Sequence, residues 1–209
     1  MIGYYNYTVI LTYLGLASAV AGMVQAVSGN YRVAVLLLIF CGFCDMFDGT
    51  VARTRERTPE EISFGAHIDS LCDMICFGAF PALLGYSFGI CRNVFGLIAM
   101  VIYVLAAVIR LAYFDVQEMS RIQNDEGMRE YYTGLPVTTS ALVVPAIVIL
   151  MALAGVSASV YYSALLIVLA ALFISKLKIK KIYGKGLFIL AGVGSIVFFL
   201  IVFLGDRIG

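Results

Sequence analysis

Four aspartates stand at helical spacing in two neighbouring apolar segments. Asp45 and Asp48 are three residues apart and Asp69 and Asp73 are four apart, so each pair lies on one face of an α-helix. Four carboxylates gathered within a membrane repel one another and are costly to desolvate, and divalent cations remove both penalties. Carboxylate oxygens favour Mg²⁺, Mn²⁺ or Ca²⁺ over zinc. Two such ions can bridge a pyrophosphate, so the spacing predicts phosphoryl chemistry.

Small residues and one arginine share these faces. Gly49, Ala52 and Arg53 continue the stripe that begins at Asp45, and Gly65 lies one turn before the second aspartate pair. Small residues let a polar ligand approach the backbone closely, and a guanidinium group can bind phosphate. The residues alone leave two interpretations open. One is metal-dependent phosphoryl transfer, and the other is a proton or cation path of the kind that transporters keep.

The chain that must position these residues is very apolar. Its 209 residues are 62% hydrophobic and 13% charged, whereas a soluble domain is nearer half apolar and a quarter charged. Seven segments are long enough to span hydrocarbon, at 8–28, 33–52, 67–90, 94–116, 136–155, 158–175 and 187–205. Helices satisfy their own backbone polar groups in lipid. The sequence therefore predicts an all-α, polytopic membrane bundle that forms one domain over residues 1–209.

Positive charge orients the predicted bundle. With seven spans and the N-terminus in the cytoplasm, ten lysines and arginines fall on the cytoplasmic side and three on the other. The connections 53–62 and 176–185 are then cytoplasmic, and we expect a multi-pass protein of the cell membrane with its site facing the cytoplasm. A six-span arrangement, with the first or last segment lying in the interface, stays open. No basic stretch is interleaved with aromatics, so nucleic acid is not an expected partner.

The aspartates and small residues form a longer pattern. D-x2-D-G-x2-A-R…G-x3-D-x3-D, from Asp45 to Asp73, resembles the signature of the CDP-alcohol phosphotransferase (phosphatidyltransferase) family. The family usually has eight or nine residues between the arginine and the second glycine, and here residues 54–64 number eleven. We expect the added residues to lie in an exposed loop that contains Pro59, Glu60 and Glu61, where extra length costs little.

The flanking segments resemble the phosphatidylserine synthase branch of that family. They are DSLCDMICFGAFPALL (69–84), IRLAYF (109–114, with Tyr113 where that branch usually has arginine) and YTGLPVTTSA (132–141). The resemblance covers roughly residues 8–175. It implies a catalytic six-helix core over that range, with 187–205 as an additional transmembrane segment.

The resemblance also implies roles. Asp45, Asp48, Asp69 and Asp73 would hold divalent metal, Mg²⁺ or Mn²⁺ and two ions, and Asp73 would also be the general base. The CDP site would be lined by Gly49, Ala52, Arg53 and Gly65. The implied reaction transfers a phosphatidyl group from CDP-diacylglycerol to L-serine with release of CMP. The family resemblance also implies a homodimer surrounded by membrane lipids.

Several alternatives remain. Arg110 is an intramembrane cation, expected either to hold the phosphate of the lipid or the carboxylate of serine, or to pair with Asp115. The acceptor could be glycerol 3-phosphate or inositol phosphate, but intramembrane cations are few, which favours zwitterionic serine. An archaeal-type lipid donor stays open. A cation-coupled transporter should show broken helices or internal repeats, and the sequence shows no clear repeat.

Overall fold

Apolar segments of the chain fold as helices in this computed structural model, which describes residues 3–4, 7–52, 54–56, 58–90, 93–123, 131–155, 158–180 and 185–204. The α-helices are α1 (Ile10–Val27), α2 (Tyr31–Ala52), α3 (Pro59–Asp73), α4 (Phe80–Ser87), α5 (Val94–Gln123), α6 (Ser140–Ala154), α7 (Ala158–Phe173) and α8 (Lys185–Leu204). A π-helical turn, η2 (Met74–Ala79), joins α3 to α4. Short 3₁₀ turns, η1 (Tyr7–Val9) and η4 (Val137–Thr139), precede α1 and α6.

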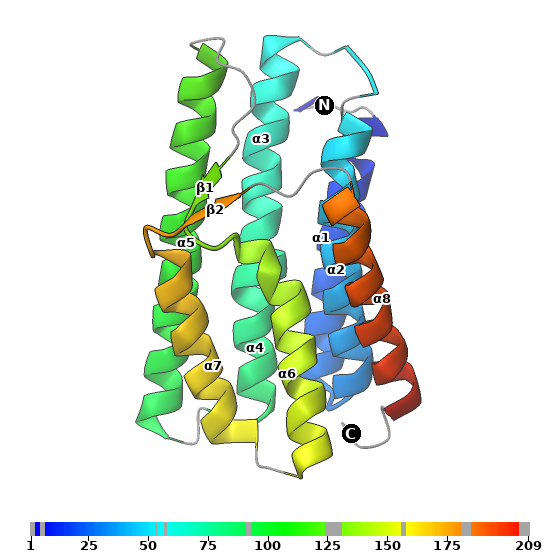
Figure 1. Cartoon of the computed structure of the whole chain (residues 1–209), viewed down its shortest axis with the longest axis vertical. Helices are drawn as coiled ribbons and strands as arrows, with labels where there is room; N and C mark the ends of the chain where they lie inside the picture. Colours follow the sequence, from blue (N-terminus) through cyan, green and yellow to red (C-terminus); the bar gives the residue numbers. More distant parts are fainter. Residues whose placement is uncertain are drawn as a thin grey trace.

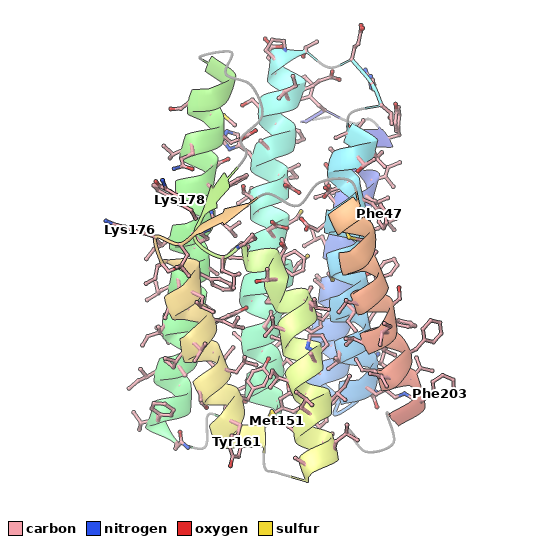
Figure 2. The ribbon with its side chains drawn as sticks, viewed as in Figure 1. Phe47, Met151, Tyr161, Lys176, Lys178 and Phe203 are labelled. Carbon is pink, nitrogen blue, oxygen red and sulfur yellow. The ribbon has the colours of Figure 1, made fainter. Side chains whose placement is uncertain are left out.

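The helices have the length and composition of membrane spans. Among the described residues, five stretches are long and apolar enough to cross a bilayer, and two shorter apolar helices, 161–173 and 191–203, accompany them. Large apolar side chains cover the outside. Phe203, for example, points away from the bundle and is 80% exposed (Figure 2). The predicted polytopic helical bundle is therefore confirmed, and the protein is a multi-pass membrane protein.

The rod formed by α3, η2 and α4 lies at the centre of the bundle. Figure 1 shows it between α5 and α7 on one side and α1, α2 and α8 on the other, with α6 in front. α1 packs mainly against α2, and α5 against α7. Tyr103, Tyr162 and Phe77 are fully buried where these helices meet. The predicted metal ligands of α2 and α3 are thus placed inside the bundle.

The third span begins earlier than predicted. We expected residues 59–61 in an exposed loop, but they form the first turn of α3. Thr58 caps this helix: its Oγ1 accepts from the N–H of Glu61 at 3.3 Å, while the Glu61 carboxylate accepts from the N–H of Thr58 at 3.1 Å. Pro59 at the first helical position costs no hydrogen bond, since that N–H has no partner within the helix. The residues added relative to the family pattern therefore lengthen a helix as well as a loop.

A two-stranded ribbon was not predicted. β1 (Tyr131–Thr133) pairs antiparallel with β2 (Lys178–Lys180), and this ties the connection before α6 to the connection after α7. Gly134 continues the pairing, because its N–H donates to the carbonyl of Leu177 at 2.8 Å. Lys176 and Lys178 are exposed and point outward at the level of the ribbon (Figure 2).

Candidate metal centre

Three of the four aspartates converge from two helices. Asp45 and Asp48 on α2 and Asp69 on α3 each offer a carboxylate oxygen, and these oxygens all lie within 4.8 Å of one another. This is the only group of three or more acidic, histidine or cysteine side chains so arranged among the residues that the structure describes. Hard oxygen donors at this separation fit Mg²⁺, Mn²⁺ or Ca²⁺ and do not fit a structural zinc site.

Asp73 stands beside this group without belonging to it. It lines the same cavity as the other three carboxylates, and its side chain is within hydrogen-bonding reach of Asp45. It is the last residue of α3, and the π turn begins at the next residue. The four predicted ligands are therefore brought to one cavity, with Asp73 as the outlying member.

Among the residues that the structure describes, the wall of the cavity carries acidic side chains and no other charged ones. Apart from the four carboxylates, its described lining consists of Thr12, Gly15, Cys41, Cys44, Cys72, Cys76 and Phe77. The four cysteines are buried and free, and no lysine, arginine or histidine belongs to this described lining. Four carboxylates with no cationic side chain among the described residues that line their cavity need a compensating charge, which a divalent cation would supply.

Thr12 of α1 is a contributor that the sequence reasoning missed. It is buried, and its hydroxyl donates to Oδ2 of Asp48 at 3.4 Å. Gly15, one turn later, faces the cavity too, and a Cβ there would come within 3.3 Å of the Cβ of Cys44. α1 can therefore approach α2 closely and close one side of the site. A lone threonine within an apolar span was the only signal, and it does not distinguish a ligand partner from a satisfied hydroxyl.

The small residues of the predicted CDP site lie on the loop side of the carboxylates. Gly49 and Ala52 follow Asp48 along α2 toward the α2–α3 connection, and Gly65 precedes Asp69 by one turn of α3. None of the three lines the carboxylate cavity itself. Arg53, which was predicted with them, lies outside the described residues.

Arg110 is placed apart from the carboxylates. It is 7% exposed on α5, its guanidinium lies over the ring of Phe114 at 5.7 Å, and it is not among the cavity-lining residues. Asp115, its alternative partner in the sequence analysis, holds His67 instead, with 2.9 Å between Oδ2 and Nδ1. The structure therefore does not bring Arg110 to the carboxylate cavity.

Proteins of similar sequence support this interpretation of the site. A model of the CDP-alcohol phosphatidyltransferase family matches residues 5–177. Similar curated proteins include archaetidylserine synthase of Methanothermobacter thermautotrophicus (27% identity, 85% of this chain and 70% of that protein). Two others are named CDP-diacylglycerol–serine O-phosphatidyltransferase. The one from Methanocaldococcus jannaschii is 29% identical over 84% of this chain and 76% of that protein, and the one from Saccharomyces cerevisiae is 35% identical over 54% of this chain and 41% of that protein. The chain thus spans less than half of the yeast protein. The match over most of its length shows that the chain belongs to the CDP-alcohol phosphatidyltransferase family.

Proposed function

We propose that this chain transfers the phosphatidyl group of a CDP-linked lipid to L-serine and releases CMP. The observation that carries the proposal is the convergence of the Asp45, Asp48 and Asp69 oxygens within 4.8 Å. A cluster of this kind suits the two anionic phosphates of a CDP-lipid only when metal is bound. Membership of a transferase family supports this reading over the transporter alternative, and the names of the similar proteins support serine as the acceptor.

In this proposal Asp45, Asp48 and Asp69 would hold divalent metal, two ions in all, and Asp73 beside them would be the fourth ligand. Mg²⁺ or Mn²⁺ bound there would neutralise the pyrophosphate and make CMP a better leaving group. The Thr12 hydroxyl holds Asp48 by its Oδ2, and this restricts the carboxylate to one orientation. Gly49, Ala52, Arg53 and Gly65 would receive the nucleotide on the loop side of the carboxylates.

Asp73 is the proposed general base. The serine hydroxyl oxygen forms a bond to the phosphorus that bears diacylglycerol, the bond from that phosphorus to CMP breaks, and the hydroxyl proton passes to the Asp73 carboxylate. The pKa of a free hydroxyl is too high for early proton removal, so the carboxylate accepts the proton late in the displacement. Asp73 lines the cavity without belonging to the three-oxygen group, and this supports a role for it separate from that of the other three carboxylates.

The placement in the cell is also proposed. The excess of positive charge puts the α2–α3 connection, and with it the opening of the site, at the cytoplasmic face of the cell membrane. The homodimer expected from the family resemblance stays a prediction. So does the lipid, because both diacyl and archaeal-type donors suit a chemistry that acts on the pyrophosphate alone.

The test measures CMP release from CDP-diacylglycerol in detergent with Mg²⁺ or Mn²⁺. Asp69→Asn should abolish turnover while the protein inserts and purifies normally. Asp73→Asn should retain binding of CDP-lipid yet lose about 10²- to 10⁴-fold in rate, the usual effect of removing a general base. Asp115→Asn is the matched control, since Asp115 lies outside the cavity, and it should stay close to wild type. Full activity of Asp69→Asn would refute the metal assignment.

The acceptor is tested in the same assay. L-Serine should support CMP release, whereas glycerol 3-phosphate and inositol phosphate should not, because no cationic side chain is found among the described cavity-lining residues to bind an anionic phosphate in addition to the two of the CDP-lipid. Equal or faster release with either phosphate would overturn serine as the acceptor and leave the phosphatidyl transfer itself in place.

A further inference from the structure

The helix that carries Asp69 and Asp73 changes its winding immediately after Asp73. Residues 74–79 form a π turn, in which the N–H of Phe80 donates to the carbonyl of Ile75, five residues back. Each π hydrogen bond spans one residue more than an α bond. One residue corresponds to a rotation of about 100° in an α-helix, since 3.6 residues make a turn. The π turn thus sets how the carboxylate face of α3 is oriented relative to the packed face of α4.

A proline explains why this turn needs outside support. In an α-helix the carbonyl of Phe77 would receive the N–H of residue 81, which is Pro81 and has none. Two side-chain hydroxyls donate to the Phe77 carbonyl instead. Tyr103 Oη on α5 donates to the Phe77 carbonyl at 2.6 Å, and Ser140 Oγ at the start of α6 lies 3.4 Å from the same oxygen.

Both hydroxyls are completely shielded. Tyr103 and Ser140 are each 0% exposed, so water cannot replace either donor if it is removed. Phe77 itself lines the carboxylate cavity, as does Cys76 beside it. The hydrogen bond to the Phe77 carbonyl therefore supports the wall of the metal site, four residues along the chain after Asp73.

We propose that Tyr103 is a positioning residue for the metal site: it holds the π turn and thereby the orientation of Asp73 toward Asp45. The inference rests on the proposed function, because it takes the four aspartates as the metal ligands. Tyr103 touches neither carboxylate in this arrangement, and it acts through the backbone of Phe77. Groups that orient ligands from behind typically change metal affinity by about 10- to 100-fold when they are removed.

The test compares two tyrosines that lose only a hydroxyl. Tyr162→Phe is the matched control, because Tyr162 is also 0% exposed and its hydroxyl donates to a backbone carbonyl of the same rod, that of Pro81, at 2.8 Å. Pro81 lies outside the cavity lining. Mn²⁺ binding to the purified protein, without substrate, is measured by electron paramagnetic resonance, together with the melting temperature. We expect both variants to melt earlier, but Tyr103→Phe alone to weaken Mn²⁺ binding, by about 10-fold or more.

The outcomes separate the inference from the proposed function. Equal Mn²⁺ affinity of Tyr103→Phe and wild type, or equal losses in both tyrosine variants, would overturn the positioning role. If Tyr103→Phe does not fold, Ser140→Ala decides, because it leaves the Phe77 carbonyl to Tyr103 alone. Mn²⁺ affinity at the wild-type level supports Tyr103 as the positioning donor, and a loss of about 10-fold or more would assign the role to Ser140 and overturn the inference. Failure of the wild type to bind Mn²⁺ would refute the proposed metal site, and the inference would fall with it.

Discussion

The loop after β1 can be tested by adding one methyl group to Gly134. This glycine has φ +80°, a conformation that L-residues rarely adopt, and it lies against the end of α7. A Cβ there would come within 2.6 Å of the Phe173 carbonyl oxygen and 3.0 Å of the Ser175 carbonyl oxygen. Both are backbone atoms at the helix end, so they cannot swing away as a flexible side chain would.

The cost of Gly134→Ala follows from three terms. The left-handed conformation costs an alanine about 1–2 kcal/mol, and overpacking costs about 1–3 kcal/mol. The lower entropy of the unfolded alanine chain offsets about 0.4–1 kcal/mol of this. The net destabilisation is therefore about 1–4.5 kcal/mol. Gly155→Ala is the matched control, because Gly155 has φ +63° and no atom within 4 Å of an added Cβ. Its substitution therefore involves the conformational cost and the entropy offset, but no overpacking.

The assay is the melting temperature of both variants in the same detergent. Their difference isolates the overpacking term of about 1–3 kcal/mol, and at about 2–4 °C per kcal/mol for a chain of this size Gly134→Ala should melt about 2–12 °C below Gly155→Ala. Equal melting temperatures would refute the close approach of this loop to α7. They would also remove the reason for placing Gly134 beside Arg110, whose Nε lies 3.4 Å from the added Cβ.

Two further predictions concern the N-terminus of α3 and the topology. Thr58→Ala should destabilise the protein by about 0.5–2 kcal/mol through loss of the cap, whereas Thr58→Ser, which keeps the hydroxyl, should not; equal melting of the two variants would contradict the capping box. Lys178→Cys should react with a membrane-impermeant maleimide from the cytoplasmic face of vesicles, with the wild type as the background, because Lys178 is exposed on the ribbon. Reaction from the opposite face alone would reverse the proposed orientation.

Helical periodicity was enough to find the carboxylates. Asp45 and Asp48, and Asp69 and Asp73, share faces because three- and four-residue spacings always do so in a helix, and the structure brings all four to one cavity. The start of α3 was also readable, since Thr58 and Glu61 have the spacing of a capping box. The prediction failed there because apolar length was used to set the boundary of the span, and the first turn of α3 is polar.

Other parts could not be read from periodicity. β1 and β2 have three residues each and join segments almost fifty positions apart, so neither has a recognisable strand pattern of its own. The contribution of Thr12 depends on which face of α1 meets α2, and a span apolar on all sides does not reveal this. Both features depend on tertiary contacts between different elements of the chain, and a pattern within one segment does not reveal such contacts.

The π turn after Asp73 shows how contacts between helices affect the geometry of the metal site. The spacing of Asp69 and Asp73 predicts that they share a face, but it is silent on the orientation of that face relative to the core, which the π turn determines. Pro81 leaves the Phe77 carbonyl without its helical donor, and in this dry interior hydroxyls from other helices satisfy it, Tyr103 at the shorter distance and Ser140 at the longer one. The carboxylates of α3 are therefore oriented by a residue of α5, about thirty positions away. A conservative change there should alter metal binding while every acidic residue stays in place.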